Sequence, residues 1–505
     1  MADQYDVIVV GAGNGGLAAA ATTAKAGLST LLLEKHNIPG GCASSFRRGR
    51  FEFEPSLHEL CGVGSKEKPY DIYNLFKELG ADVDWKYEHN LFRVICTGED
   101  GYDVKLKGGI DGLCESVEQI EAGSGQKVRA FLGYKSKIDA AINYIYKKKG
   151  NPNKLVMITK HKDFMRIASH SAEDVMTALG ISKKIQNIIN TYWCYLGVPT
   201  DELSAMHFLN LLYGYTEFGA AMPHHRSHEL SLAMVDSITK NGGKIQYNSK
   251  VTEFLYNNEG RAIGVVANGQ KLYAKEIISN VIPNNVYNMS TSAVVSEHSK
   301  KLINARSLGL SFVTIYLGIN ITAEELGIKD YTNFIVSDPN PRKQYEEMEN
   351  GSLYIVNCLN NVFEDASPAG TCSLFITLPV RADKIPDDLT PDKYKKYKND
   401  IAKDYISRIE KVMNVSIFEH IEEISIATPV SFARYLDTPG GTAYGYVLNS
   451  WDNLMVRISA EKDDFNIPGL SFCGGHHVRG DGFSSAYITG ANAANKAISR
   501  IKGGN

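Results

Sequence analysis

Three features that would place this sequence in a special class of protein are missing. Its eight cysteines are scattered over 505 residues and never form a C-x-x-C pair, so the spacing of a zinc site or a redox dithiol is absent. No apolar run reaches the roughly 18 to 20 residues that a membrane-spanning helix needs. Lys and Arg number 54 against 57 Asp and Glu, so the net charge of -3 does not favour nucleic acid as a partner.

The N-terminus also lacks the marks of an export signal. Met-Ala-Asp-Gln-Tyr has no basic segment, and the first apolar run leads straight into a Gly-rich turn. We therefore expect a cytoplasmic protein with reduced thiols, or one lying peripherally on a membrane. The Tyr- and Lys-rich stretch 144–149 fits contact with an anionic membrane surface, although a solvated helix end is the simpler interpretation.

The first residues of the chain predict a dinucleotide-binding βαβ unit. Residues 5–10 suit a buried strand, 17–26 an Ala-rich helix and 30–34 a second strand. In the intervening Gly-Ala-Gly-Asn-Gly-Gly the glycines permit a tight turn, close approach to a pyrophosphate and close helix packing. An acid at the end of the second strand accepts hydrogen bonds from a ribose diol. The cofactor-binding residues predicted here are Gly11, Ala12, Gly13, Gly15, Gly16, Glu34 and Lys35.

The residues that follow this unit indicate a flavin rather than a nicotinamide. Residues 39–46 read Pro-Gly-Gly-Cys-Ala-Ser-Ser-Phe, and residues 49–58 read Gly-Arg-Phe-Glu-Phe-Glu-Pro-Ser-Leu-His. Together they resemble the second flavin motif of the phytoene desaturase, carotenoid isomerase and retinol saturase group, and most of all its retinol saturase branch. The resemblance implies FAD as the cofactor and adds Gly41, Cys42 and Ser45 to the residues that hold it.

Further motifs resemble the same group in order along the chain. Residues 242–246 and Val251 resemble its strand against the adenine half of FAD, and 279–283 its Ser-Asn-Ala-x-Pro turn. Its C-terminal signature near the flavin ring is similar to residues 428–429, 439–445 and 468–482. The resemblance adds Val251, Gly475, Asp481 and Gly482 as cofactor-binding residues; for Asp481 an N-cap of the terminal helix is the alternative role. Since no second GxGxxG has strand and helix context, a separate NAD(P)H domain is not expected, and the electron donor or acceptor stays unidentified.

The fold class that follows is α/β, with a discontinuous Rossmann-like FAD-binding domain and an inserted α+β substrate domain, as in amine oxidases and phytoene desaturases. Helical spacing dominates residues 115 to 215. Short strands broken by Asn-Asn and Asn-Gly turns are expected at 244–247, 251–256, 262–267, 271–274 and 276–279. We expect the FAD-binding domain over 1–84, 226–300 and 455–505, and the substrate or lid domain over 85–225 and 301–454.

One segment departs from the pattern of this group. Where its members carry Pro-x-Gly-Gly-x-x-x-Leu, residues 223–230 read Pro-His-His-Arg-Ser-His-Glu-Leu. His58, and His476-His477 with Arg479, fall in the flavin motifs, so the fold of the group would bring histidines and arginines toward one cavity. Arg suits a substrate carboxylate and His exchanges protons near neutral pH, unless these groups are simply exposed or satisfied in the core. The candidate catalytic residues are His224, His228, Arg226 and His58.

A metal site is not expected. His224 and His228 have i, i+4 spacing, but the sequence around them is not H-E-x-x-H. We expect an FAD-dependent oxidoreductase that saturates, desaturates or isomerises a carbon-carbon double bond in a small lipophilic substrate with a polar or carboxylate end. An aromatic run suits the apolar body of the substrate, or else ordinary helix packing: Tyr192, Trp193, Tyr195, Phe208, Tyr213, Tyr215 and Phe218.

Two alternatives stay open. One is an amine-oxidase-like flavoprotein that oxidises a carbon-nitrogen bond, since a shared fold does not fix chemistry. The other is a flavin-stabilised protein that binds a lipid without turnover.

Overall fold

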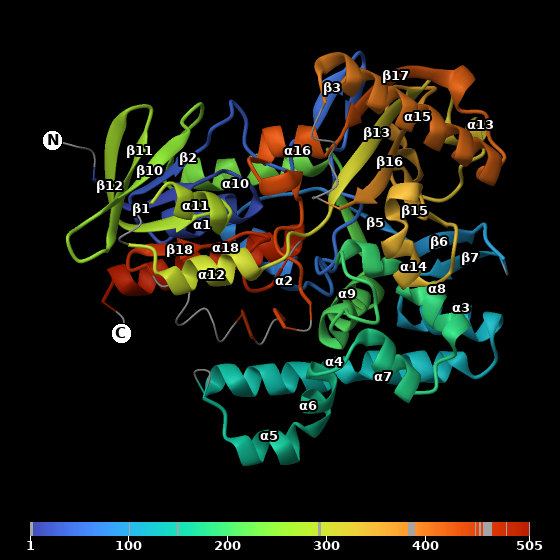
Figure 1. Cartoon of the computed structure of the whole chain (residues 1–505), viewed down its shortest axis with the longest axis horizontal. Coiled ribbons are helices and arrows are strands. Elements are labelled where there is room, and N and C mark those ends of the chain that lie inside the picture. The colour runs from blue at the N-terminus through green and yellow to red at the C-terminus, as the bar shows by residue number, and fades with distance from the viewer. Residues whose placement is uncertain are drawn as a thin grey trace.

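The computed structural model describes residues 4–99, 101–148, 151–290, 294–381, 389–449, 451–453, 456–457, 467–480 and 482–503. Figure 1 shows two sheets side by side. The first carries the N-terminus, and the second combines strands within residues 90–107 with strands within residues 311–427. A group of helices lies below the second sheet in the same view.

β1 (Gln4–Val10) lies inside the first sheet, parallel to β2 (Thr30–Leu33) on one side and to β12 (Gln270–Ser279) on the other. The strand order is β10-β11-β12-β1-β2-β9, and β18 also pairs with β12. The remaining bounds are β9 (Lys244–Gln246), β10 (Val251–Tyr256), β11 (Ala262–Ala267) and β18 (Leu470–Phe472). The sheet therefore joins three separated parts of the chain.

The strands of this sheet follow the sequence pattern with one difference. The Asn268-Gly269 turn has both residues at positive φ, 50° and 74°, as a tight hairpin between β11 and β12 requires. The two strands predicted at 271–274 and 276–279 form one continuous strand, β12, because the pairing with β1 keeps the same register on both sides of Lys275.

α1 (Asn14–Lys25), α10 (Ser227–Lys240) and α18 (Phe483–Ile501) cover the first sheet (Figure 1). α1 and α18 are rich in alanine and glycine, which lets their backbones approach closely. A Cβ on Gly490 of α18 would lie 2.0 Å from the Gly15 carbonyl oxygen. This contact sets the C-terminal helix directly against the predicted nucleotide-binding turn.

The second sheet is mixed, with strand order β17-β13-β16-β15-β14-β6-β7. Only the β14–β6 pair is parallel among its described strands. The bounds are β6 (Asn90–Cys96), β7 (Tyr102–Lys107), β13 (Ser311–Ile319), β14 (Thr332–Val336), β15 (Leu353–Cys358), β16 (Cys372–Val380) and β17 (Ile421–Ala427). α15 (Pro391–Met413) buries Ala402, Ile406 and Ile409 against this sheet.

Two short strand pairs connect the sheets: β3 (Phe46–Arg48) with β4 (Phe51–Phe53), and β5 (Trp85–Glu88) with β8 (Ala220–Pro223). α2 (Asp71–Leu79) lies against α18. The helical group comprises α3 (Ile110–Ile120), α4 (Ser124–Lys147), α5 (Lys154–Lys160), α6 (Lys162–Ala168), α7 (Ala172–Ala178), α8 (Lys183–Ile189), the 3-10 turn η1 (Asn190–Tyr195) and α9 (Ala205–Phe218).

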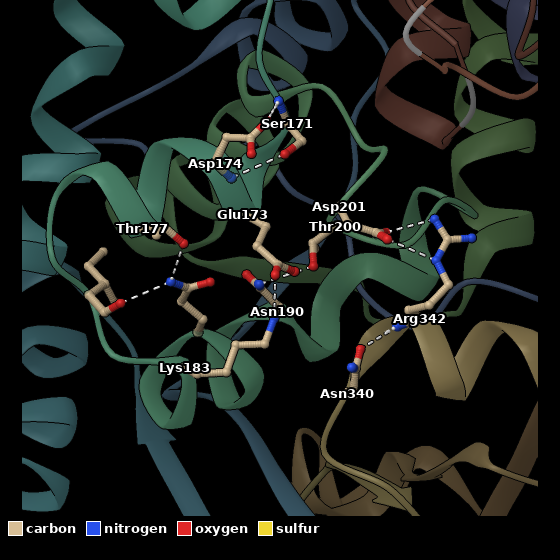
Figure 2. Close-up of polar contacts among 12 residues, drawn as sticks. Ser171, Glu173, Asp174, Thr177, Lys183, Asn190, Thr200, Asp201, Asn340 and Arg342 are labelled. Atoms are coloured by element: carbon tan, nitrogen blue, oxygen red, sulfur yellow. Dashed lines mark hydrogen bonds and ion pairs between the residues drawn. The ribbon is translucent and has the colours of Figure 1, made fainter.

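Polar contacts fix this helical group internally and to the second sheet (Figure 2). Ser171 and Asp174 form a reciprocal capping box at the start of α7. Arg342, on α14 (Pro341–Glu346), donates two hydrogen bonds of 2.9 Å to the Asp201 carboxylate. A planar guanidinium holds a carboxylate in a defined orientation, so the helices are anchored beside the sheet.

No helix within the described ranges is both long and apolar enough to cross a bilayer.

Candidate functional site

A cavity of about 1240 Å³ lies between the two sheets, α18 and the helical group. One end is lined by Gly11, Gly13, Gly15, Glu34 and Val251. The other end is lined by side chains of η1, α9, β16 and the segment that follows β4. A single cavity is thus shared by the predicted nucleotide motif and by residues far from it in the sequence.

The nucleotide end leaves no room for side chains on the turn. A Cβ on Gly13 would lie 2.7 Å from Asn280 Nδ2, and one on Gly15 would lie 2.9 Å from the Gly474 nitrogen. Gly11 has φ of 91°, a conformation that side chains rarely adopt. Bare backbone therefore faces the cavity at the start of α1, where the helix dipole favours an anionic group.

Glu34 holds this turn in place from the end of β2. Its Oε2 accepts a 2.7 Å hydrogen bond from the Ala12 N–H, and its Oε1 accepts one of 2.9 Å from the His36 N–H. The carboxylate is buried, and Glu34 also lines the cavity. Asn14 Oδ1, also buried at this end, has no hydrogen-bond partner among the described residues.

The other predicted cofactor residues divide into two sets. Lys35, Gly41, Cys42, Gly475 and Gly482 line the cavity. Ala12, Gly16 and Ser45 do not: Ala12 donates to Glu34, Ser45 Oγ donates to Glu52 Oε1 at 2.8 Å, and a Cβ on Gly16 would strike the Gly11 carbonyl oxygen. Ala12 and Gly16 therefore support the turn from behind, whereas Ser45 belongs to the neighbouring β3–β4 hairpin. Asp481 lies outside the described residues.

At the far end of the cavity, buried polar side chains lie among aromatic rings. Glu59 is 6% exposed, and its Oε1 accepts a hydrogen bond of 3.2 Å from the Tyr192 hydroxyl. His58 packs against Tyr195, with ring centroids 5.6 Å apart, and its Nε2 lies 2.9 Å from Thr377 Oγ1. Glu59, His58, Tyr195, His207, Tyr215 and Thr377 line the cavity here.

The carboxyl groups of Glu59 and Glu88 interact beside this end of the cavity. Glu88, at the end of β5, interacts with Glu59, and the Oε2 atoms of both are buried with no donor among the described residues. Burial raises the pKa of Glu59 to about 8. Burial, followed by the neighbouring Glu59 charge, raises the pKa of Glu88 well above its usual value. Two such groups are stable at neutral pH when they hold a proton between them.

Burial has the opposite effect on the histidines of the cavity. It lowers the pKa of His58, His207, His476 and His477 to about 3. For His207 the charges of Arg457 and Arg479 lower it further. Neither ring nitrogen of His207 has a partner among the described residues. These four imidazoles are neutral at pH 7, whereas the buried carboxyl group of Glu59 is held in its protonated form.

The structure corrects the expectation that His224, Arg226 and His228 face the same cavity as His58, because none of the three lines it. His224 lies between two carboxylates, with Nδ1 2.8 Å from Asp84 Oδ2 and Nε2 2.7 Å from Asp365 Oδ1. Arg226 donates to the Ala366 carbonyl oxygen. His228 lines a separate, smaller hollow beside α10.

The physical reason lies in how α10 begins. The buried carboxylate of Glu54 accepts hydrogen bonds of 2.8 Å from the Ser227 N–H and 2.9 Å from the Ser227 hydroxyl. β8, just before it, pairs with β5. These contacts fix the segment that carries His224, Arg226 and His228, and they hold the three side chains outside the cavity.

Sequence reasoning missed Glu59, Glu88 and His207. Glu59 stands next to the predicted His58, but its burial depends on tyrosines of η1 and α9, more than 130 residues away. Of the predicted aromatic run, Tyr195 and Tyr215 line the cavity, whereas Trp193 donates to Gln344 Oε1 at 2.7 Å in the core. Within the described ranges, no group of three or more His, Cys, Asp or Glu side chains is arranged to hold a metal ion.

Comparisons with known proteins agree with this arrangement. Residues 9–79 match the family model of an NAD(P)-binding Rossmann-like domain. The chain is 26% identical to all-trans-retinol 13,14-reductase of Danio rerio over 500 residues, covering 91% of this chain and 79% of that protein. It is 24% identical to 4,4'-diapolycopene oxygenase of Methylomonas sp, covering 99% of each. It is 23% identical to prolycopene isomerase 2 of an Oncidium hybrid cultivar, covering 88% of this chain and 76% of that protein.

The predicted family resemblance is confirmed. The relatives are named as reductases, an oxygenase and an isomerase, which also confirms the expected class of enzyme, an oxidoreductase or isomerase.

Solved structures confirm the predicted fold class. An oxidoreductase from Methanosarcina mazei has a TM-score of 0.65 at 16% identity, over 97% of this chain and 100% of that one. Wild-type putrescine oxidase bound to putrescine has a TM-score of 0.62 at 16% identity, over 98% and 99%. The family match over residues 9–79 supports a dinucleotide cofactor.

Proposed function

We propose that this chain is an FAD-dependent oxidoreductase that acts on a carbon-carbon double bond of a lipophilic unsaturated substrate with a polar or carboxylate end. The observation that carries the proposal is the single cavity, which joins the nucleotide motif around Gly13 and Glu34 to the buried acid Glu59. The names of the relatives, which include a retinol reductase and a prolycopene isomerase, support a polyene as the substrate.

The residues of the nucleotide end fit FAD. The glycines of the turn and the N-terminus of α1 suit a pyrophosphate, and the carboxylate of Glu34, which also lines the cavity, suits a ribose diol. Asn14 Oδ1, buried without a partner, offers an acceptor to the same ligand. When bound, FAD would supply two-electron redox chemistry. The protein's own contribution is position, exclusion of water and control of protons.

Glu59 is the proton donor that we assign in place of His224 and His228. In saturation of a double bond, one carbon gains a hydride equivalent and the other a proton. The Glu59 O–H bond would break as the second C–H bond forms, leaving a carboxylate. Because burial holds the pKa of Glu59 near 8, the acid is protonated at neutral pH. Glu88, which interacts with Glu59, is placed to return the proton.

The remaining lining residues suit the two parts of such a substrate. The apolar body fits beside the rings of Tyr195, Tyr215 and Phe312. Arg479 also lines the cavity and is itself exposed, so it lies where the cavity meets solvent. A guanidinium at that point suits a terminal carboxylate.

An anaerobic titration tests the proposal. The bound flavin is reduced chemically, and two matched polyenes are then added, one neutral and one with a terminal carboxylate. We expect the oxidised flavin band to return together with a saturated product, more readily from the acid.

Other outcomes of the same titration separate the alternatives. A rearranged product with the flavin band unchanged would indicate an isomerase. Inertness toward both polyenes, together with reduction of oxidised flavin by an amine, would overturn the proposal in favour of carbon-nitrogen oxidation.

A further inference from the structure

α5 and α6 form a short helical hairpin that exposes large apolar side chains. Leu155 and Ile158, on α5, are 69% and 64% exposed, and Met165, on α6, is 47% exposed. Leu155 and Ile158 are the two most exposed large apolar side chains of the described chain. With a spacing of three residues they share one face of the helix.

The opposite face of the hairpin is firmly packed, so this exposure is not caused by a loose segment. Met157, Phe164 and Ile167 are buried in the core of the helical group. Asn153 caps α5 by accepting hydrogen bonds from the Leu155 and Val156 N–H groups. The His161 ring stacks on Tyr144 near the end of α4, with centroids 5.2 Å apart.

The same hairpin and the adjoining end of α4 also carry exposed cations. The exposed cations of the hairpin and of the end of α4 are Lys147, Lys148, Lys154, Lys160, Lys162 and Arg166. None of the six forms an ion pair with a described residue. Asp163, the acid of the hairpin, is already paired with Lys137. A strongly basic surface stands out on a chain whose net charge is -3.

The hairpin also follows directly on a helix of the cavity wall. Lys135, Asp139 and Ile142, on α4, line the cavity. Figure 1 shows α5 and α6 beneath α4, at the outer edge of the molecule and away from the second sheet.

We propose that this hairpin is a docking surface for an anionic lipid bilayer. Leu155, Ile158 and Met165 would enter the acyl boundary, while the exposed lysines and Arg166 would contact lipid phosphates. Apolar residues on one face flanked by cations are the pattern of helices that lie in the plane of a membrane interface. Each lysine or arginine near an anionic surface contributes attraction that salt screens.

Vesicle flotation tests the proposal without reference to turnover. The full-length protein is mixed with vesicles of phosphatidylcholine alone, or of phosphatidylcholine and phosphatidylglycerol in equal parts. We expect the protein to float with the anionic vesicles, less so at high salt, and weakly with the neutral ones. The variant Leu155→Asp/Ile158→Asp should lose about tenfold or more of this binding, since apolar burial drives insertion.

Matched variants keep the result specific. Leu232→Asp/Phe418→Asp introduces the same charges at exposed apolar positions on other elements and should bind like wild type. Lys154→Gln/Lys160→Gln/Lys162→Gln should lose the preference for anionic vesicles, whereas Lys271→Gln/Lys329→Gln/Lys411→Gln should keep most of it. Circular dichroism checks that each variant is folded.

Two outcomes would overturn the proposal. One is flotation that is equal for the Leu155→Asp/Ile158→Asp variant and wild type. The other is absence of vesicle binding with salt-sensitive binding to an RNA oligomer, which would assign the basic surface to nucleic acid.

Discussion

Burial controls proton chemistry in the cavity residue by residue. The same loss of water that keeps His58 and His207 neutral keeps Glu59 protonated, because desolvation disfavours the charged form of each group. Sequence reasoning placed acid-base function on histidines because imidazole exchanges protons near neutral pH in water. Burial removes that property from His58, and His224 and His228 do not line the cavity. The proposed assignment to Glu59 rests on its burial, which only the three-dimensional structure shows.

The first prediction concerns the pH dependence of double-bond reduction. In the proposed reaction the acid form of Glu59 donates the proton, so the rate should be level below about pH 8 and fall above it. Glu59→Gln should lower the rate by about 10²-fold or more and remove that fall. Single-turnover rates measured from pH 6 to 10 test this.

Tyr192→Phe is the control for this prediction. The Tyr192 hydroxyl stabilises the Glu59 carboxylate and so lowers its pKa. Removal of this hydroxyl should shift the decline in the single-turnover rate to higher pH. The rate below that decline should be unchanged. A Glu59→Gln profile that still falls near pH 8 would show that another group is responsible.

The second prediction concerns stability. The pKa of Glu59 is raised in the folded state, so the folded chain binds more protons than the unfolded chain between its unfolded pKa and about pH 8. The free energy of unfolding should therefore fall with rising pH in this window, by at most about 1.4 kcal/mol per pH unit from this group. Urea unfolding of Glu59→Gln should show a shallower dependence, and an unchanged slope would contradict the raised pKa.

At the scale of elements, local motifs were predictable and the orientation of whole segments was not. The Gly-rich turn, β1, α1 and β2 lie where the sequence placed them, because glycine spacing and apolar runs report local geometry directly. The 223–228 segment resembled a flavin-facing element by its position in the chain. A buried contact from Glu54, 173 residues before Ser227, instead sets the start of α10.

The third prediction tests the close contact between the nucleotide turn and its neighbours. In Gly15→Ala the added carbon would lie 2.7 Å from Asn280 Oδ1 and 2.9 Å from the Gly474 nitrogen. We expect a loss of about 1–3 kcal/mol of stability and reduced flavin content after gel filtration. Gly133→Ala, in α4 with open space around it, should keep full flavin content and gain slightly in stability.

At the scale of the whole molecule, the sequence indicated two interwoven units and the structure shows what lies between them. The matched motifs predicted a Rossmann-like sheet, and the strands of that sheet do come from separated blocks. The extent of the shared cavity was not predictable, since residues of both sheets and of the helical group line it.

The fourth prediction follows from this shared lining. A ligand that binds the folded state but not the unfolded state raises the free energy of unfolding. The increase is about 2.7 kcal/mol when the free ligand concentration is a hundred times Kd. FAD added to flavin-free protein should therefore raise the midpoint of thermal unfolding. NAD added at the same concentration should have little effect, and a larger shift with NAD than with FAD would contradict the assignment of the cofactor.

The pairing of β1 with β12 and of β12 with β18 also governs how the chain is made. During translation β1 and β2 emerge close together, yet β12, on the other side of β1, follows about 270 residues later and β18 later still. The first sheet is therefore incomplete until β18 has been synthesised, and until then its apolar strands have unpaired edges. Ribosome-bound chains should depend on chaperones, and a C-terminal truncation before β18 should yield aggregates rather than a smaller soluble domain.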